Sequence, residues 1–356
     1  MSLPLDSLRS VISRLQDPEI PRSLGDLRMV KGVTAAGNGL RVDIELPTPA
    51  YPGRERIADL IRNAVAPQLP AGAPVDVQFS TTVKGKNTGG AVGLKIKNII
   101  AVGSGKGGVG KSTIAAALAY GLKHFGAKVG LMDADVYGPS IPHLVGARGE
   151  PVMRQIPLPD GSTMERIVPI EADGLQLMSM GFMVRPDQAV IWRGPMLHKA
   201  LTQFLQQTEW GELDYLVIDM PPGTGDVALT LSQMVGLAGA VVVCTPQQVA
   251  LLDAVKAISM YRTVKIPILG IVENMSGDVF GRGGARAKAA ELGIPFLGEV
   301  PSEALIRIRG DEGRMSALFN EDNPARAPLE HVVSRTAMEI ARQLLESPSL
   351  PTLEIL

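Results

Sequence analysis

The stretch from residue 98 to 113, NIIAVGSGKGGVGKST, constrains the fold of this chain more than any other part of it. It begins with apolar residues typical of a buried parallel strand, continues with a glycine-rich turn, and leads into an Ala/Leu-rich segment typical of a helix. Between that strand and that helix, Gly105 to Ser112 matches the pattern G-x-x-x-x-G-K-[ST]. The sequence therefore predicts a strand–loop–helix unit that binds a polyphosphate.

Each part of this pattern has a physical role in holding phosphate. Glycines let successive backbone N–H groups turn inward without Cβ clashes, and the start of the helix adds the positive end of its dipole. Lys111 is expected to reach the β- and γ-phosphates of ATP, and the Ser112 hydroxyl to bind Mg²⁺. The predicted nucleotide-binding residues of this segment are Gly105, Lys106, Gly107, Gly108, Val109, Gly110, Lys111, Ser112 and Thr113.

The same glycines allow a second interpretation. Gly103, Gly105 and Gly108 also spell G-x-G-x-x-G, and Asp133 follows the next predicted strand, roughly where a ribose-binding carboxylate lies in dinucleotide sites. A lone G-x-G-x-x-G is a weak signal, and a dinucleotide site gives the Lys-Ser pair no role. The polyphosphate loop is therefore the favoured interpretation, over both a dinucleotide site and a glycine turn without a ligand.

Composition disfavours several classes of partner. The chain has 356 residues, of which 35 are basic and 36 acidic, so it lacks the basic footprint of a protein that binds nucleic acid or an anionic membrane. No apolar stretch reaches the roughly 18 residues of a spanning helix, and the N-terminus lacks the pattern of a signal peptide. We expect a cytoplasmic protein with no nucleic-acid or membrane partner.

Hydrophobic periodicity divides the chain into two domains. Residues 1–80 follow the order α-β-β-α-β, which predicts a small α+β domain, and residues 81–97 are rich in Gly, Lys and Thr, which predicts a linker. From residue 98 to 356, apolar runs alternate with helical segments, which predicts a doubly wound, mostly parallel α/β sheet. Its strands are expected at residues 98–102, 128–132, 214–218, 239–243, 267–272 and 295–300.

Carboxylates follow two of these strands. Because the carboxyl ends of parallel strands border the ligand crevice in such folds, Asp133 and Asp135 are predicted to face the nucleotide. Asp219 ends the apolar run LVID, as a Walker-B carboxylate does when it holds Mg²⁺ through water. We expect these side chains to lie near the phosphate loop.

Lys106 adds a second lysine inside the loop, so that the motif resembles the K-G-G-x-G-K-[ST] loop of the deviant P-loop ATPases, which include ParA, MinD and nitrogenase iron proteins. This resemblance implies that Lys106 reaches across a homodimer to the partner's nucleotide and acts in catalysis with Lys111. It also implies that Asp135 orients or activates the attacking water and that Asp133 lies near Mg²⁺. The run PPGTGD at 221–226 resembles the γ-phosphate-sensing switch II of these proteins.

Three further stretches narrow the resemblance to the Mrp/ApbC group. They are DADVYGPS at 133–140, WRGPM at 192–196 and ENMS at 273–276, and the last implies that Asn274 hydrogen-bonds the adenine base. In the first domain, DPE at 17–19 and TPAYP at 48–52 resemble the small domain of iron–sulfur assembly factors. The resemblance implies a Mg²⁺-dependent ATPase that works as a homodimer and carries a [4Fe–4S] cluster between iron–sulfur assembly proteins and apoprotein clients.

The chain departs from that group at the positions of its cysteines. Carriers of this type have a C-x-x-C between ENMS and the following F-G-x-G-G, whereas here only GDV at 277–279 separates the two stretches, and Tyr51 stands where members commonly carry cysteine. A bridging cluster takes four thiolates, and a dimer of this chain has only its two copies of Cys244, which the pattern predicts to be a small buried hydrophobe. We identify no iron–sulfur ligands.

Two functions therefore stay open from the sequence. One is an ATPase that carries an iron–sulfur cluster, which the resemblance along the whole chain favours. The other is an ATPase whose nucleotide state switches the binding of a protein partner and which carries no cluster, which the missing cysteines favour.

Overall fold

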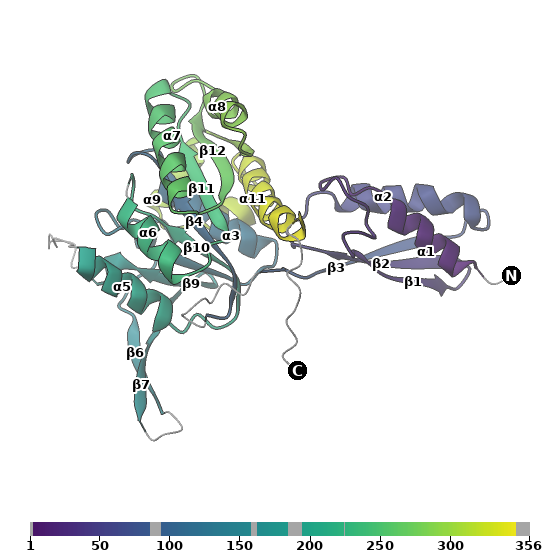
Figure 1. Ribbon diagram of the computed structural model, residues 1–356, viewed down its shortest axis with the longest axis horizontal. Coiled ribbons are helices and arrows are strands. Elements are labelled where there is room, and N and C mark those ends of the chain that lie inside the picture. The colour runs from purple at the N-terminus through teal and green to yellow at the C-terminus, as the bar shows by residue number, and fades with distance from the viewer. Residues whose placement is uncertain (1–2, 86–93, 158–161, 184–193, 224, 347–356) are drawn as a thin grey trace. The chain divides into compact units, whose positions relative to one another are not determined.

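The computed structural model describes residues 3–85, 94–157, 162–183, 194–223 and 225–346, and its chain divides into two compact units (Figure 1). Contacts group residues 1–84 and 337–356 in the small unit and residues 85–336 in the large unit. The end of the last helix, α11 (Arg326–Glu346), is thus grouped with the small unit, although the sequence places it in the second domain. Most of the predicted linker, residues 86–93, lies outside the described residues.

The small unit has the predicted order α-β-β-α-β. Its three strands are arranged β1-β2-β3, with β1 antiparallel and β3 parallel to the central strand, and the two helices pack on one side of this sheet. The apolar side chains of the alternating stretch 40–46 are buried, as the pattern predicts. The elements are α1 (Leu5–Arg14), β1 (Val30–Ala36), β2 (Gly39–Leu46), α2 (Arg54–Val65) and β3 (Val75–Thr81).

Tyr51 is built into the interior of this unit. Its hydroxyl donates a hydrogen bond of 2.6 Å to Oδ2 of the buried Asp17, whose Oδ1 accepts from the backbone N–H groups of Glu19 and Ile20. Burial, together with the neighbouring Asp17 carboxylate, raises the pKa of Tyr51 above its usual range. The residue that stands at the family's cysteine position is therefore a structural hydrogen-bond donor.

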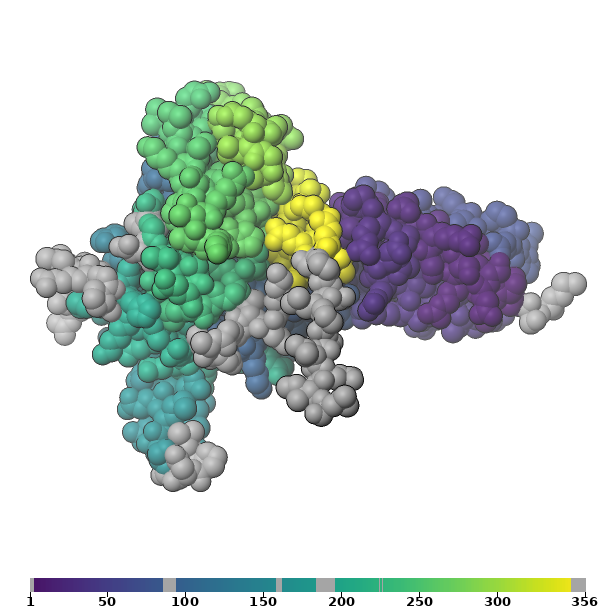
Figure 2. All heavy atoms as spheres, in the orientation of Figure 1, coloured from purple at the N-terminus to yellow at the C-terminus, as the bar shows by residue number. Residues whose placement is uncertain are grey.

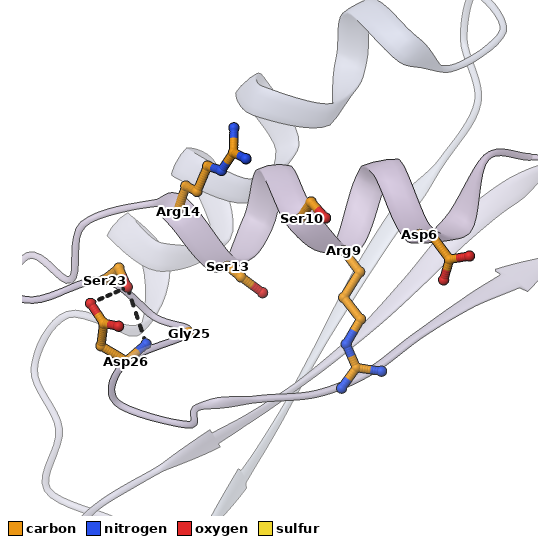
Figure 3. A pocket seen from close by; sticks show the side chains of 8 residues that line it. All are labelled: Asp6, Arg9, Ser10, Ser13, Arg14, Ser23, Gly25 and Asp26. Atoms are coloured by element: carbon orange, nitrogen blue, oxygen red, sulfur yellow. Dashed lines mark hydrogen bonds between the residues drawn. The ribbon is translucent and has the colours of Figure 1, made fainter.

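The surface of the small unit carries a shallow polar hollow of about 520 Å³ between α1 and the turn at residues 23–26 (Figure 3). The turn is closed by Ser23, whose hydroxyl donates to an Asp26 carboxylate oxygen at 2.7 Å and accepts from the Asp26 N–H. No apolar side chain lines the hollow. Its lining residues are Asp6, Arg9, Ser10, Ser13, Arg14, Ser23, Gly25 and Asp26.

An eight-stranded sheet forms the centre of the large unit. Its order is β13-β12-β11-β4-β10-β5-β9-β8, and every pair of neighbours is parallel except β8 with β9, so the predicted doubly wound, mostly parallel class is confirmed. The strands are β4 (Ile96–Gly103), β5 (Val129–Asp133), β8 (Ile170–Ala172), β9 (Leu175–Ser179), β10 (Leu213–Asp219), β11 (Gly239–Cys244), β12 (Ile268–Ser276) and β13 (Phe296–Pro301).

Helices cover both faces of this sheet, which is why its strands are almost continuously apolar. One face packs against α5 (Gly194–Gln206), α6 (Gly225–Met234), α7 (Gln248–Thr263) and α8 (Gly284–Leu292) in a single apolar core. On the other face lie α3 (Lys111–His124), α4 (Ile141–Leu144), α9 (Ala304–Asp311), α10 (Ala317–Asn320) and part of α11.

The sequence pattern did not predict the elements between β5 and α5. They include strand β9, the edge strand β8 and a separate two-stranded hairpin of β6 (Val152–Pro157) and β7 (Thr163–Val168). The hairpin exposes most of its side chains on both faces, so it lacks the apolar–polar alternation from which strands are predicted. The predicted stretch WRGPM lies partly in 184–193, outside the described residues.

Replacing Tyr51 by phenylalanine should destabilise the small unit. The change leaves Asp17 Oδ2 buried without its tyrosine donor, and an unsatisfied buried group costs about 1–3 kcal/mol. Hydrogen exchange at the amides of Glu19 and Ile20 should report a loss of protection of that size. The matched control is Tyr137→Phe, because the Tyr137 side chain is exposed. If the amides of Glu19 and Ile20 were equally protected in the two variants, the structural role of the Tyr51 hydroxyl would be contradicted.

Candidate nucleotide-binding site

The predicted phosphate loop connects the central strand to a helix. β4 ends at Gly103, and α3 begins at Lys111. Gly108 and Gly110 both have φ of +78°, a left-handed conformation that glycine adopts without strain. No side chain caps α3, so the backbone N–H groups of its first turn are free of side-chain acceptors. A helix start of this kind is suited to an anion.

The backbone of α7 forms one wall of the loop. A Cβ at Gly105 would lie 2.1 Å from the carbonyl oxygen of Asp253 in α7, so only glycine allows this close approach. The loop is further held by the Ser104 hydroxyl, which donates to the Lys106 carbonyl at 2.8 Å. From the predicted switch run, the N–H of Gly223 donates to the Ser104 carbonyl at 2.9 Å; Thr224 of that run lies outside the described residues.

Strand register brings the predicted carboxylates to the loop. Because β10 lies between β4 and β5, Asp219 is paired with Val102 on one side and with Asp133 on the other. Lys111, at the first position of α3, is buried, and its ammonium nitrogen lies 2.6 Å from Asp219 Oδ1 and 3.5 Å from Asp135 Oδ2. It also lies 3.3 Å from the Ser112 hydroxyl. The structure thus brings together the predicted lysine, serine and aspartates.

The aspartates differ in their surroundings. Asp133 accepts hydrogen bonds from the Ser179 hydroxyl and the backbone N–H groups of Asp135 and Ile141, yet burial and the neighbouring Asp219 raise its pKa to about 7. Burial also raises the pKa of Asp219, against the opposing effect of Lys111. Asp219 Oδ2 is buried and has no hydrogen-bond partner within the described part of the chain. This atom is therefore a free acceptor facing a buried charge cluster.

Asp135 is oriented by the backbone that follows it. Its Oδ1 accepts from the N–H groups of Tyr137 and Gly138, both at 3.2 Å, while Oδ2 faces Lys111. The structure thus places the carboxylate beside the loop lysine. Its predicted action on the attacking water stays a prediction.

Asn274 lies behind the loop. Its side-chain amide donates to the Val109 carbonyl at 2.9 Å, and a Cβ at Gly110 would lie 2.2 Å from the same amide nitrogen. Asn274 thereby connects the end of β12 to the phosphate loop. The predicted adenine contact stays a prediction, and the structure shows in addition a positioning contact that the sequence did not indicate.

Glu273, the residue before Asn274, was missed by the sequence analysis. Its buried carboxylate accepts hydrogen bonds of 2.7 Å from the N–H groups of Gly283 and Ala285, at the start of α8. The signal that could have found it is a lone acidic residue in an apolar strand followed by a glycine-rich turn. Between these partners, Gly277 and Gly281 exchange two backbone hydrogen bonds, so the short GDV loop is a closed turn.

Cys244 lies inside the sheet. It is the last residue of β11 and is buried, its sulfur lies 3.8 Å from the Val272 carbonyl, and burial raises the pKa of its thiol to about 12. Among the residues that the structure describes, no three His, Cys, Asp or Glu side chains are grouped to hold a metal ion by themselves. In the same part of the chain, no helix is both long and apolar enough to cross a membrane.

Lys106 differs from Lys111 in being partly exposed. Within the described residues, no hydrogen bond or ion pair holds its side chain. The Cβ positions of Gly107 and Gly108 beside it are open. The ammonium group is therefore available to a group outside this chain.

Comparison with known proteins agrees with this geometry. A family model described as NUBPL iron-transfer P-loop NTPase, of the ParA type, matches residues 95–337, and a model described as iron–sulfur cluster assembly protein matches residues 5–79. Among solved structures, the chain is similar to a nucleotide-binding protein from Archaeoglobus fulgidus in complex with ADP, with 37% identity, a TM-score of 0.54, and coverage of 65% of this chain and 91% of that one.

The cell division ATPase MinD from Pyrococcus furiosus shares the fold, with 21% identity, a TM-score of 0.51, and coverage of 67% of this chain and 97% of that one. Relatives of similar length are named iron–sulfur cluster carrier protein. That of Synechocystis is 42% identical over 96% of this chain and 99% of its own length, and that of Escherichia coli is 39% identical over 94% and 93%. The chain therefore belongs to the iron–sulfur cluster carrier family of ParA-type P-loop NTPases.

Proposed function

We propose that this chain is a Mg²⁺-dependent ATPase that acts as a homodimer in the delivery of iron–sulfur clusters. The observation that carries the proposal is the buried cluster at the start of α3, where Lys111 lies against Asp219 and Asp135. One carboxylate would balance the charge of this lysine, so the structure itself has no need for two. The arrangement is suited to a site in which phosphate oxygens replace the carboxylates as partners of the ammonium group.

The residues present fit a magnesium ion. Asp219 Oδ2 is buried without a partner among the described residues, and the Ser112 hydroxyl belongs to the same cluster. Hydroxyl and carboxylate oxygens are the ligands that Mg²⁺ prefers, and it takes only one or two carboxylates when phosphates supply the rest. Ser112, Asp219 and Asp133 would hold the ion, which neutralises charge on the phosphates when bound.

The protein groups then have separate tasks. Lys111 binds the β- and γ-phosphates, and the loop N–H groups surround them. Asp135, fixed by two backbone N–H groups, orients the attacking water. Asn274 positions the loop through Val109 and, by the family resemblance, hydrogen-bonds the adenine base.

The surface beside the loop supports a homodimer. Val249 and Leu252, on the first turns of α7, are 66% and 62% exposed, and the next residue, Asp253, is the one that touches Gly105. An apolar rim at a nucleotide site is suited to a protein partner. With Lys106 free on the same loop, a second copy could receive this lysine at its own nucleotide.

The cysteine geometry favours a second candidate function. Cys244 is buried in the sheet, and the loop that replaces the family's cysteine pair is a closed turn. In this alternative the nucleotide state controls the binding of a protein partner, and the homodimer holds no cluster of its own.

Lys111→Ala should weaken ATP binding by roughly 30-fold or more, because loss of a buried charge contact costs about 2–5 kcal/mol. Isothermal titration calorimetry measures this directly. The matched control is Lys95→Ala, since Lys95 is an exposed lysine of the same unit, and its ammonium group lies 3.7 Å from the exposed Glu212. Equal affinity in the two variants would refute the phosphate-loop assignment.

Lys106→Ala should leave ATP affinity nearly unchanged while it lowers both hydrolysis and ATP-dependent dimerisation. The reason is that Lys106 has no partner within the described residues of its own chain. Phosphate release and light scattering with ATP measure the two effects. Normal turnover together with full dimer formation in the variant would exclude the role in trans.

The second candidate function predicts that the isolated protein does not assemble a stable bridging [4Fe–4S] cluster, although it binds ATP. Two buried Cys244 thiols per dimer cannot supply the four thiolates that such a cluster takes. Anaerobic reconstitution with iron and sulfide, followed by visible absorption and iron counting, tests this. A stable brown product with about four irons per dimer that passes to an apoprotein would contradict the second candidate function, in which the homodimer holds no cluster.

A further inference from the structure

The β6–β7 hairpin is a separate feature of the large unit. It is a two-stranded sheet outside the eight-stranded one, and Figures 1 and 2 show it projecting from the body of this unit near α5. Ile167 is the only buried residue of its two strands. Val152 is 66% and Met153 50% exposed. Burial within the chain therefore does not account for the apolar side chains on this hairpin.

One face of the hairpin has a regular arrangement of side chains. Cross-strand register sets Arg154 directly opposite Arg166, and side chains two positions apart share a face. An apolar pair therefore lies on either side of the two arginines, Val152 with Val168 and Ile156 with Met164. The face thus presents apolar, basic and apolar pairs in sequence along the strands.

The positive charge of the two arginines is only partly balanced by neighbouring carboxylates. Arg154 forms an ion pair of 3.1 Å with Glu209, whereas Arg166 donates to the Gln206 backbone carbonyl. Within the described residues no carboxylate pairs with Arg166. Like charges directly opposite each other in a sheet are destabilising, so the pair carries a cost that the hairpin itself does not offset.

The two edges of the hairpin are not equivalent. On the β7 side, Ile167 exchanges backbone hydrogen bonds with Gln207 and Glu209, which follow α5. On the β6 side, the described part of the chain contains no strand partner other than β7. A row of backbone N–H and C=O groups on an exposed edge is a template for an added strand.

We propose that the outer edge of β6 binds an extended segment of a partner protein as a third strand, with the pattern apolar–x–acidic–x–apolar. The acidic residue lies beside Arg154, on the face that both arginines share, and adds a second carboxylate to the one that Glu209 supplies to this pair. The apolar residues pack against Val152 and Ile156, because side chains on one face recur every second residue. The site is independent of the nucleotide chemistry proposed above.

Charge also decides against a second copy of this chain as the occupant. Pairing two β6 edges would place four arginines on one small sheet, and inward or edge charges of this kind oppose self-association. An acidic segment would instead bring negative charge to the arginines and would be attracted to this edge. The surface therefore fits a different protein, such as a client of the proposed delivery function.

The test uses the full-length chain and two labelled peptides, acetylated and amidated, with the sequences TVTETVT and TVTKTVT. Fluorescence anisotropy should show that the glutamate peptide binds at least about tenfold more tightly, or about 1.4 kcal/mol. N-methylation of its alternate backbone nitrogens should abolish binding, because a strand then cannot pair. No saturable binding of the glutamate peptide, or equal binding of both peptides, would overturn the proposal.

Arg166→Glu should reverse the preference, so that the lysine peptide binds more tightly. Arg307→Glu is the matched control, since Arg307 is an exposed arginine on α9 that forms an ion pair with the exposed Asp311. Calorimetry with ATP shows that each variant keeps its fold, because neither residue belongs to the nucleotide site. An unchanged preference in Arg166→Glu with intact ATP binding would also overturn the proposal.

Discussion

The ion pair between Lys111 and Asp219 is the interaction on which the large unit's site depends. Both groups are buried, and a buried charge is tolerated only where an opposite charge or several hydrogen bonds compensate it. One ammonium group serves Asp219 and Asp135, with Asp133 next to them, so the cluster is short of positive charge. The raised pKa values of Asp133 and Asp219 follow from that shortage and from burial.

The parallel pairing of β4, β10 and β5 brings these charged residues together at one edge of the sheet. The chain passes from β4 to β5 before β10 inserts between them, and the carboxyl ends of all three strands then meet at one edge. The loop after β4, the two aspartates after β5 and the aspartate that ends β10 converge there without a specially shaped connection. The burial of both sheet faces keeps water away from the cluster's inner side.

The end of β12 connects this site to the start of α8. Successive residues of a strand point to opposite sides, so Asn274 reaches the phosphate loop while Glu273 accepts hydrogen bonds at the start of α8. One short segment therefore contacts both the phosphate loop and the start of α8.

The sequence by itself determined the elements whose signals are local. The phosphate loop, the apolar parallel strands and the alternating stretch 40–46 are set by glycine placement and hydrophobic period, which act within a few residues. Only the tertiary structure decided contacts between distant segments: Asn274 with Val109, Tyr51 with Asp17, and the cap that Glu273 places on α8. It also decided the β6–β7 hairpin, because exposed strands bury no apolar face and so leave no period in the sequence. Hydrogen bonds of buried polar groups depend on which strands become neighbours, and that order is fixed by packing of the whole sheet.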